Sequence, residues 1–288
     1  MKLFERERGA FFYYGGKSFM VEDIISEIAK FKSKYDVNCV VDVFGGAGNV
    51  ILNIPPEWRV KRIWNDLDKR LYITMKVLTD ERKRKKLIDK LEYTVTSRDL
   101  FEEAGTFQKN FQKEIKSGIN SEINEDDELT IAYYFLVSSN MGFNGGNFGF
   151  STKKGYKAEP IYGYTEFLKR WSEMRKHLVI ENLDFEELIR RYDAKRTLFY
   201  LDPPYLKSGR KHYDLSFNED DFTRLVSVLS EIKGIYLMNE SSVDFEFVKS
   251  LFGEPYMTLQ YTNLAENPKY TGGKKGKRFE GYWSNRRY

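Results

Sequence analysis

The chain has 288 residues, with 47 lysines and arginines against 43 aspartates and glutamates, and therefore a formal net charge of +4. No apolar run reaches the roughly 20 residues of a membrane-spanning helix, and the N-terminus lacks a signal-peptide pattern, so we expect neither. A single cysteine, Cys39, excludes disulfides within the chain and thiolate-rich zinc sites, and two isolated histidines are too few for a histidine metal site. The 16% aromatic content would suit a surface that stacks bases, but the small positive charge alone indicates little about nucleic acid.

The first part of the sequence predicts the beginning of an α/β sheet. Apolar residues at helical spacing predict a helix from Ser18 to about Tyr35. Residues 37–54 contain an apolar run, then glycines, then another apolar stretch, which predicts a strand, a tight turn and a helix; a second strand follows at 60–66. Because a strand–helix–strand order with glycines at the first turn is typical of doubly wound sheets, we predict the α/β class.

The remainder of the sequence divides into a helical part and a second group of strands. From about residue 71 to 176 the pattern is charge-rich and mostly helical, with no strand-like run of comparable quality. Ser216 and Glu219 form a predicted capping box ahead of a helix at 221–233. Strand-like runs resume at 178–185, 197–205 and 234–241, and a closing hairpin is predicted from 255–263 and 279–285.

Two glycine-containing turns could approach a ligand. In the turn DVFGGAG, Gly46 and Gly48 would let the backbone come close to a ligand, and the helix behind them would offer free N–H groups. The spacing is not the dinucleotide fingerprint, so a tight turn without a ligand is the alternative. Lys17 follows two glycines as in a P-loop, but Phe11 stands where that loop needs a glycine, which excludes it. Lys17 could still bind a carboxylate or a phosphate, or it could be a solvated lysine beside a helix cap.

Asp202, Pro203, Pro204 and Tyr205 follow the predicted strand TLFYL. In α/β sheets ligands bind beyond the carboxyl ends of the strands. The prolines fix the backbone and leave their carbonyls as rigid acceptors. A carboxylate, a carbonyl and a tyrosine ring suit an amine on a flat aromatic ring, because they supply two acceptors and one stacking face. Asp-Pro also occurs in ordinary turns, which is the alternative for the isolated tetrapeptide.

Six motifs resemble, in the same order, those of the Dam-like DNA adenine-N6 methyltransferases: YYGGKS, DVFGGAG, WNDLD, NLDF, LDPPY and FEGYWSN. They span Tyr13 to Asn285, and their order is similar to the alpha type. The resemblance implies a Rossmann-like class I methyltransferase fold with a mostly parallel seven-stranded sheet. It also implies S-adenosyl-L-methionine as cofactor, S-adenosyl-L-homocysteine as product and no metal. The expected domains are a discontinuous catalytic domain at 1–75 and 177–288, and a helical target-recognition domain inserted at 76–176.

The resemblance assigns cofactor contacts to the first two motifs. Tyr13 and Lys17 would anchor the methionine carboxylate, although many relatives have tryptophan where this chain has Tyr13. Phe44, Gly46 and Gly48 would line the methionine side of the cofactor.

The resemblance also assigns acidic residues to the nucleoside part of the cofactor. Asp66, after the second strand, would accept hydrogen bonds from the ribose hydroxyls, which agrees with the general rule for such an acidic residue. Asp68 competes for this role, but its offset of two residues favours capping the next helix. The cofactor's adenine has two candidates, Asp99 and Asp184. Because Ser97 predicts an N-cap that explains Asp99, we choose Asp184.

The family mechanism rotates the target adenine out of the duplex. Asp202, which would also face the cofactor, and the carbonyl of Pro203 would accept the two hydrogens of N6, so that its lone pair can attack the sulfonium methyl. Pro204 belongs to the same rigid motif, and Tyr205 would stack on the base. The alternatives are an RNA adenine methyltransferase, a cytosine-N4 or protein-glutamine methyltransferase, and, in another class, a catalytically inactive DNA-binding factor. The leading Asp202 favours DNA adenine.

The expected partner is double-stranded DNA. Contacts with it are expected at the FNG segment and at two lysine pairs, namely Phe143, Asn144, Gly145, Lys153, Lys154, Lys274 and Lys275. A flexible turn rich in glycine and asparagine is the alternative for the first group, and binding at the last pair should weaken as salt rises. The basic run at 82–86 more closely fits a solvated helix face. We expect no membrane contact, a monomer with a dimer left open, and a cytoplasmic protein, bacterial or phage-encoded, that acts at the nucleoid.

Overall fold

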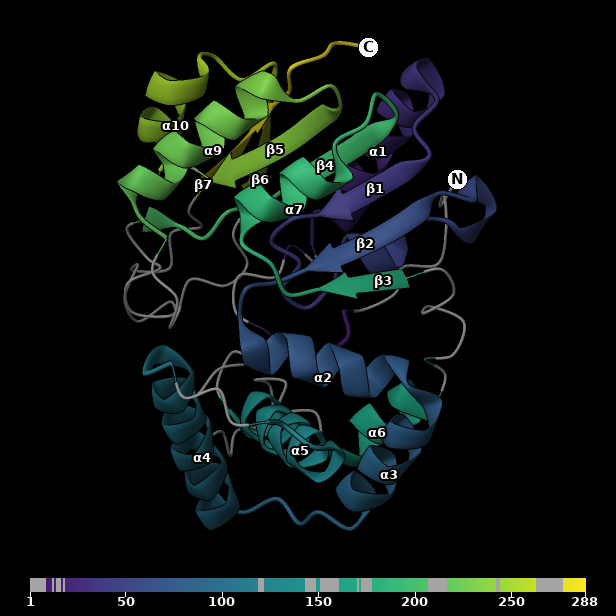
Figure 1. Cartoon of the computed structure of the whole chain (residues 1–288), viewed down its shortest axis with the longest axis vertical. Helices are drawn as coiled ribbons and strands as arrows, with labels where there is room; N and C mark the ends of the chain where they lie inside the picture. Colours follow the sequence, from purple (N-terminus) through teal and green to yellow (C-terminus); the bar gives the residue numbers. More distant parts are fainter. Residues whose placement is uncertain are drawn as a thin grey trace. The chain divides into compact units, whose positions relative to one another are not determined.

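The computed structural model (Figure 1) describes residues 9–11, 13, 17, 19–118, 122–142, 149–150, 161–169, 171, 178–206, 217–241, 244–262 and 277–288. Contacts divide the chain into two compact units. The first comprises Met1–Ile25 and Gly45–Leu183, and the second comprises Ser26–Phe44 and Asp184–Tyr288. These bounds do not test the inserted domain at 76–176, which stays a prediction.

A seven-stranded sheet has the order β3-β2-β1-β4-β5-β7-β6. The pairs β2–β3, β1–β4 and β4–β5 are parallel, whereas β7 is antiparallel to both β5 and β6. The strands are β1 (Cys39–Asp42), β2 (Lys61–Asn65), β3 (Leu178–Glu181), β4 (Thr197–Leu201), β5 (Ile235–Ser241), β6 (Met257–Thr262) and β7 (Lys277–Trp283). The predicted α/β class, the mostly parallel sheet and the closing hairpin are confirmed.

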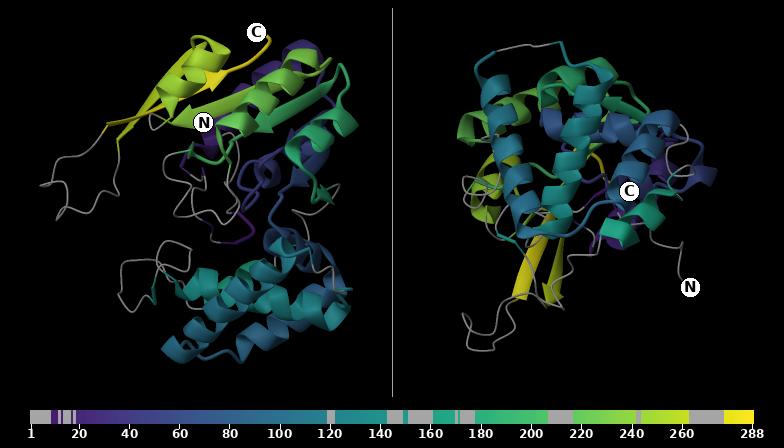
Figure 2. Two further views of the ribbon diagram at one scale, coloured as in Figure 1. Left: turned by 60° about the vertical axis from the view of Figure 1, so that its left-hand side comes forward. Right: turned by 90° about the horizontal axis from the view of Figure 1, so that it is seen from below.

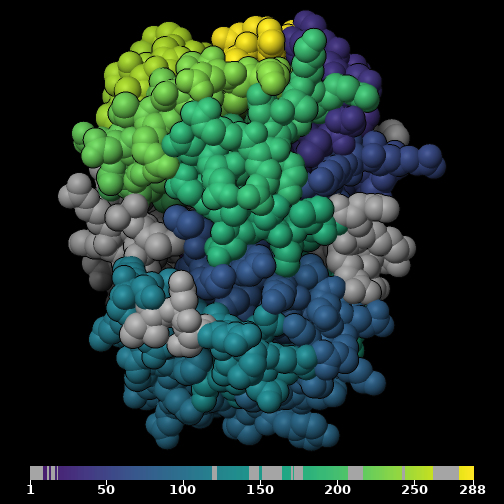
Figure 3. All heavy atoms as spheres, in the orientation of Figure 1, coloured from purple at the N-terminus to yellow at the C-terminus, as the bar shows by residue number. Residues whose placement is uncertain are grey.

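Two strands of the second unit, β1 and β4, are buried along their whole length. Every residue of β1 and β4 is buried, and the two strands pair from Cys39 with Thr197 to Asp42 with Tyr200. Strands covered on both faces have such continuous apolar runs. Three helices, α7 (Phe185–Tyr192), α9 (Glu219–Glu231) and α10 (Phe245–Phe252), lie on one face of β4 and β5 (Figure 1). Side chains of α7 and α9 cover that face in Figure 3.

The first unit contains β2, β3 and a group of helices, and α1 (Val21–Tyr35) begins in it. The helices are α2 (Lys69–Thr79), α3 (Glu81–Glu92), α4 (Arg98–Lys116), α5 (Glu125–Met141) and α6 (Ile161–Lys169). α5 packs against both α2 and α4, and α3 packs against α6 (Figure 2). Apolar residues on α2 and α5, among them Leu71, Val77, Ala132 and Leu136, are buried in these contacts. The predicted helical part is therefore confirmed among the described residues. A membrane-spanning helix, which would have to be both long and strongly apolar, is not found among them.

The prediction of a helix directly after the glycine turn is wrong. Between Gly48 and β2 the chain forms two short 3-10 turns, η1 (Ile51–Asn53) and η2 (Pro56–Trp58), and no α-helix. Pro56 has no N–H to donate, and a proline disfavours helical backbone in the residue before it, so an α-helix cannot extend through this stretch. The glycine turn therefore has no α-helix N-terminus behind it.

The predicted capping box of Ser216 and Glu219 is also wrong. Asn218 caps α9: its Oδ1 accepts hydrogen bonds from the N–H groups of Asp220 and Asp221 at 2.8 and 3.1 Å. The Asp221 carboxylate accepts the N–H of Asn218 at 3.0 Å and completes the box. Glu219 is the first residue of the helix, which is too early for the reciprocal bond of a capping box.

We expect Asn218→Ala to lower the free energy of unfolding by about 1 kcal/mol, because two N–H groups of α9 lose their acceptor. Asn218→Ser should restore most of this loss, since serine is an equally favoured cap. Chemical denaturation of the three proteins measures both differences. Equal stability of the alanine variant and the wild type would contradict the assigned cap.

Candidate functional site

The glycine turn after β1 is bound to the end of β2 within the first unit. The Gly45 N–H donates to the carbonyl of Asn65 at 2.7 Å, and the Gly46 N–H donates to Asp66 Oδ2 at 2.9 Å. Trp64 Nε1 donates to the Gly46 carbonyl at 3.2 Å. Gly46 and Gly48 have φ angles of +48° and +74°, which favour glycine. The backbone conformation of the turn is therefore sufficient to explain both glycines. These bonds place the bare backbone of Gly46 beside Asp66.

Asp66 is half-buried and each of its carboxylate oxygens accepts one backbone N–H. Oδ2 accepts from Gly46, and Oδ1 accepts from Asp68 at 2.9 Å. Burial raises the pKa of Asp66 to about 6; the nearby Asp68 carboxylate adds to the rise, and the two N–H groups and Arg70 oppose it. Asp68 has a different task, because its Oδ1 accepts the N–H of Arg70 at 2.9 Å and caps α2. The expected cap at Asp68 is therefore confirmed.

Two asparagines, which the sequence analysis did not single out, hold the loop that carries Asp66. Asn65 is buried, donates to the Leu183 carbonyl at 3.1 Å and accepts the Leu183 N–H at 2.9 Å. Asn182 Nδ2 donates to the backbone carbonyl of Asp66 at 2.8 Å. The sequence did carry a signal for both. Asn65 directly precedes Asp66 in the motif WNDLD, and Asn182 is the first residue of the motif NLDF.

Tyr13 and Lys17 both belong to the first unit. A Cβ added at Gly46 would come within 3.5 Å of the Tyr13 ring, so the ring lies against the turn. Phe11 packs edge-on against Phe135 of α5 at 5.0 Å, which fixes this N-terminal segment on the helix. Lys17 is buried, with only 3% of its surface exposed, which is rare for a lysine and contradicts the solvated-lysine alternative. The structure therefore brings Tyr13, Gly46 and Asp66 together.

The tetrapeptide lies in the second unit, directly after the buried strand β4. Pro203 and Tyr205 are buried, and Asp202 and Pro204 are half-buried. Two residues before Asp202, in β4, Tyr200 donates to Asn239 Oδ1 of β5 at 2.5 Å. Burial, with the Asp202 carboxylate as the next cause, raises the pKa of Tyr200 well above its usual value, so the hydroxyl stays a donor. Asn239 was not singled out from the sequence either; its signal was an asparagine directly after the apolar run of β5.

Phe44 and Asp184 also belong to the second unit. The Phe44 ring lies 6.0 Å from Phe185 and 5.5 Å from Phe217, in an aromatic group next to Asp184. Asp184 caps α7 by accepting the N–H of Glu186 at 3.0 Å, and it forms an ion pair with Arg224 at 2.8 Å.

Asp99, the other candidate for the cofactor's adenine, has the structural position that its sequence context predicts. It lies in the first turn of α4, whose cap Ser97 accepts the N–H of Leu100 at 3.2 Å. Because Asp184 is itself a helix cap, capping does not separate the two candidates. The choice of Asp184 stays a prediction.

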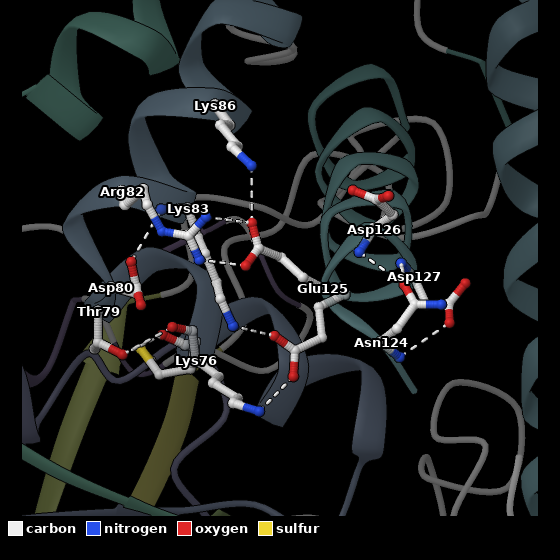
Figure 4. A network of polar contacts seen from close by, with 12 residues as sticks. Lys76, Thr79, Asp80, Arg82, Lys83, Lys86, Asn124, Glu125, Asp126 and Asp127 are labelled. Carbon is white, nitrogen blue, oxygen red and sulfur yellow. Dashed lines mark hydrogen bonds and ion pairs between the residues drawn. The ribbon is translucent and has the colours of Figure 1, made fainter. Parts of the chain in front are cut away.

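The basic run at 82–86 is engaged by acidic residues of α5 (Figure 4). Arg82 and Lys86 form ion pairs with Glu125, and Lys83 pairs with Glu128 at 2.6 Å. These partners favour a structural role for the run over contact with phosphates. The predicted DNA contacts Phe143, Asn144, Gly145, Lys153, Lys154, Lys274 and Lys275 lie outside the described residues.

The α/β fold with its mostly parallel seven-stranded sheet is of the Rossmann-like methyltransferase type. The chain matches the D12 class N6 adenine-specific DNA methyltransferase family over residues 13–266, and it belongs to that family. It is therefore an adenine-specific DNA methyltransferase, and its substrate is DNA. No curated protein matches the sequence. The resemblance drawn from the six motifs is confirmed.

The raised pKa of Asp66 predicts a pH-dependent contribution to stability. The folded protein holds the Asp66 proton more tightly than an unfolded aspartate of pKa 3.8 does, so this stabilisation is complete below that pH and is lost as pH rises through about 6. Asp66→Asn carries no such ionisation. We expect the unfolding free energy of this variant, relative to wild type, to increase between about pH 4 and pH 7 in denaturation series. A difference that stays constant over this range would contradict the raised pKa.

Proposed function

We propose that the chain transfers a methyl group from S-adenosyl-L-methionine to N6 of an adenine that is rotated out of duplex DNA. The observation that carries this proposal is the position of Asp202–Tyr205 at the carboxyl end of the buried strand β4. Base rotation is needed because an amine paired inside the duplex is out of reach of an enzyme side chain.

The residues of the first unit fit a nucleoside that carries an amino-acid tail. A carboxylate has about four lone-pair sites, and Asp66 uses one on each oxygen for a backbone N–H, which leaves acceptors for two ribose hydroxyls. Gly46 and Gly48 present backbone without side chains, and the Tyr13 ring lies against the first of them. We assign Lys17 to the carboxylate of the tail. When bound, the cofactor supplies a methyl group on a sulfonium, and S-adenosyl-L-homocysteine is the product.

In the second unit, Phe44 and Asp184 complete the proposed set of cofactor residues. Phe44 would contact the methionine side, and Asp184 would accept a hydrogen bond from the cofactor's adenine. Asp184 keeps an exposed carboxylate face, with 36% of its side-chain surface accessible, beside its bond to Arg224. Both assignments follow from the motifs.

The tetrapeptide prepares N6 of the target for attack. The Asp202 carboxylate and the Pro203 carbonyl accept its two hydrogens, so that the lone pair is withdrawn from the ring and directed at the methyl group. These acceptors stabilise the positive charge that develops on the amine, which is the main electrostatic contribution. Asp202 then takes the proton that N6 releases. The prolines hold the backbone rigid, and the Tyr205 ring stacks on the rotated base.

DNA binding is proposed for segments on either side of the tetrapeptide in sequence. The FNG segment would reach the bases, and the two lysine pairs, Lys153–Lys154 and Lys274–Lys275, would contact phosphates. A monomer is sufficient for this scheme, since all the assigned residues come from one chain.

We expect Asp202→Ala to abolish methyl transfer to duplex DNA, with a loss of at least about 100-fold, because one acceptor for N6 and the developing charge is removed. Asp89→Ala, at an exposed position of α3, is the control and should stay active. Incorporation of labelled methyl groups into DNA gives both rates, and circular dichroism checks folding. A folded Asp202→Ala protein with near wild-type activity would rule out the assigned mechanism. Label found in RNA or on cytosine N4 would instead select the alternative substrates.

Cofactor binding should depend on the ionisation of Asp66. Because the carboxylate must accept ribose hydroxyls, we expect the affinity for S-adenosyl-L-homocysteine to fall as pH decreases through about 6, the raised pKa. Asp66→Ala should bind about 10-fold more weakly or worse and lose this pH dependence. Calorimetric titrations between about pH 5 and pH 8 measure both effects. An affinity that is the same for wild type and variant across this range would refute the ribose contact.

A further inference from the structure

Asp244 precedes α10, but its side chain does not cap that helix. Six other capping side chains in the described residues accept an N–H from the helix that they precede: Asp68, Asp80, Ser97, Asn124, Asp184 and Asn218. Asp244 occupies the same position before Phe245–Phe252 and makes no such bond. An aspartate is among the best N-cap residues, so its use elsewhere requires an explanation.

The Asp244 carboxylate instead bonds the residue that follows the tetrapeptide. Its Oδ2 accepts the N–H of Leu206 at 2.7 Å. Asp244 is only 1% exposed, and its Oδ1 is buried with no hydrogen-bond partner among the described residues. A buried carboxylate oxygen without a partner costs stability, which a cap on α10 would have avoided. The carboxylate therefore serves the backbone just beyond Tyr205 at the expense of its own helix.

The helix that carries Asp244 is itself fixed at both ends on β7. At its start the Phe245 ring lies 5.5 Å from the Trp283 ring, and a Cβ at Gly281 would come within 2.7 Å of Phe245, so only glycine lets this ring lie on the strand. At its end, Trp283 Nε1 donates to the Gly253 carbonyl at 2.8 Å. Asp244 consequently holds Leu206 from a rigid base.

We propose that Asp244 is a positioning residue for methyl transfer, which fixes the backbone beyond Tyr205 through the N–H of Leu206. The tether keeps the Tyr205 ring and the Pro203 carbonyl in the orientation that the target amine requires. A displacement of about 1 Å at such a site can cost about 100-fold in rate. The role rests on the function proposed above for the tetrapeptide. It concerns the rate of the chemical step, since Asp244 is not assigned to cofactor binding.

Three substitutions separate positioning from helix capping. Asp244→Ser places a favoured cap residue before α10, but its hydroxyl is one bond shorter and cannot reach the N–H of Leu206 in the same way. Asp244→Asn keeps an acceptor of the same length. Asp244→Ala removes the acceptor for Leu206 and supplies no cap for α10. Asn218→Ala is the matched control, because it removes a cap from another helix of the same unit and leaves Leu206 bonded.

Steady-state methylation of duplex DNA, together with thermal unfolding, gives the test. We expect Asp244→Ser to fold and to lower kcat at least about 10-fold, with KM for S-adenosyl-L-methionine within about twofold. Asp244→Asn should stay within about threefold of wild type, and Asn218→Ala should lose stability but keep its kcat. If Asp244→Ala fails to fold, Asp244→Ser alone decides.

Two outcomes for kcat would overturn the role of Asp244 without touching the proposed function: a wild-type kcat in Asp244→Ser, or an Asp244→Asn protein as slow as Asp244→Ser. A change confined to KM for the cofactor would also overturn it. A wild-type chain that methylates no adenine would instead overturn the proposed function, and the role of Asp244 with it. The wild-type reaction thus tests the proposed function, and the kcat of the Asp244 variants relative to wild type tests the role of Asp244.

Discussion

The Asp66 carboxylate is the group on which the glycine turn of the first unit depends. Its two bonds, to the N–H groups of Gly46 and Asp68, connect the glycine turn to the end of β2. The same carboxylate is proposed to bind the ribose, so one side chain both shapes the turn and binds the ligand that the turn admits. Burial raises its pKa to about 6, which leaves it ionised at neutral pH with little margin. The N–H groups of Gly46 and Asp68, together with the nearby Arg70, stabilise the ionised form of this half-buried carboxylate.

The second unit uses the same device with a different purpose. There the buried Asp244 accepts a backbone N–H at 2.7 Å, and the bonded residue, Leu206, directly follows the tetrapeptide. Carboxylates form stronger hydrogen bonds to N–H groups than neutral acceptors do, so each is an effective way to fix a short segment of irregular backbone. Asp66 and Asp202 follow the ends of β2 and β4, and the carboxylates of Asp66 and Asp244 accept backbone N–H groups of the loops beyond these strands.

Much of the fold could be predicted from the sequence because its signals are local. The apolar runs of β1 and β4 and the glycines at 46 and 48 depend on neighbouring residues, and they predicted the sheet and the turn correctly. The prediction of a helix after the turn was wrong because it followed the apolar pattern, whereas Pro55 and Pro56 prevent the helix from continuing. The cap of α9 was wrong by two residues, since Ser216 and Asn218 are both good caps and only the helix start distinguishes them.

The supporting contacts of the site could not be predicted in the same way. Asn182 bonds the loop of Asp66, which is 116 positions away in sequence, and Asp244 bonds Leu206, which is 38 positions away. No periodicity or motif links such pairs, because they meet only when the strands have assembled.

The most direct measurement is methyl transfer from labelled S-adenosyl-L-methionine to duplex DNA, followed by digestion to nucleosides and their separation. We expect the label in N6-methyldeoxyadenosine and in no other nucleoside. Label in N4-methyldeoxycytidine, label only when RNA is supplied, or cofactor binding without any transfer would contradict adenine methylation by Asp202–Tyr205.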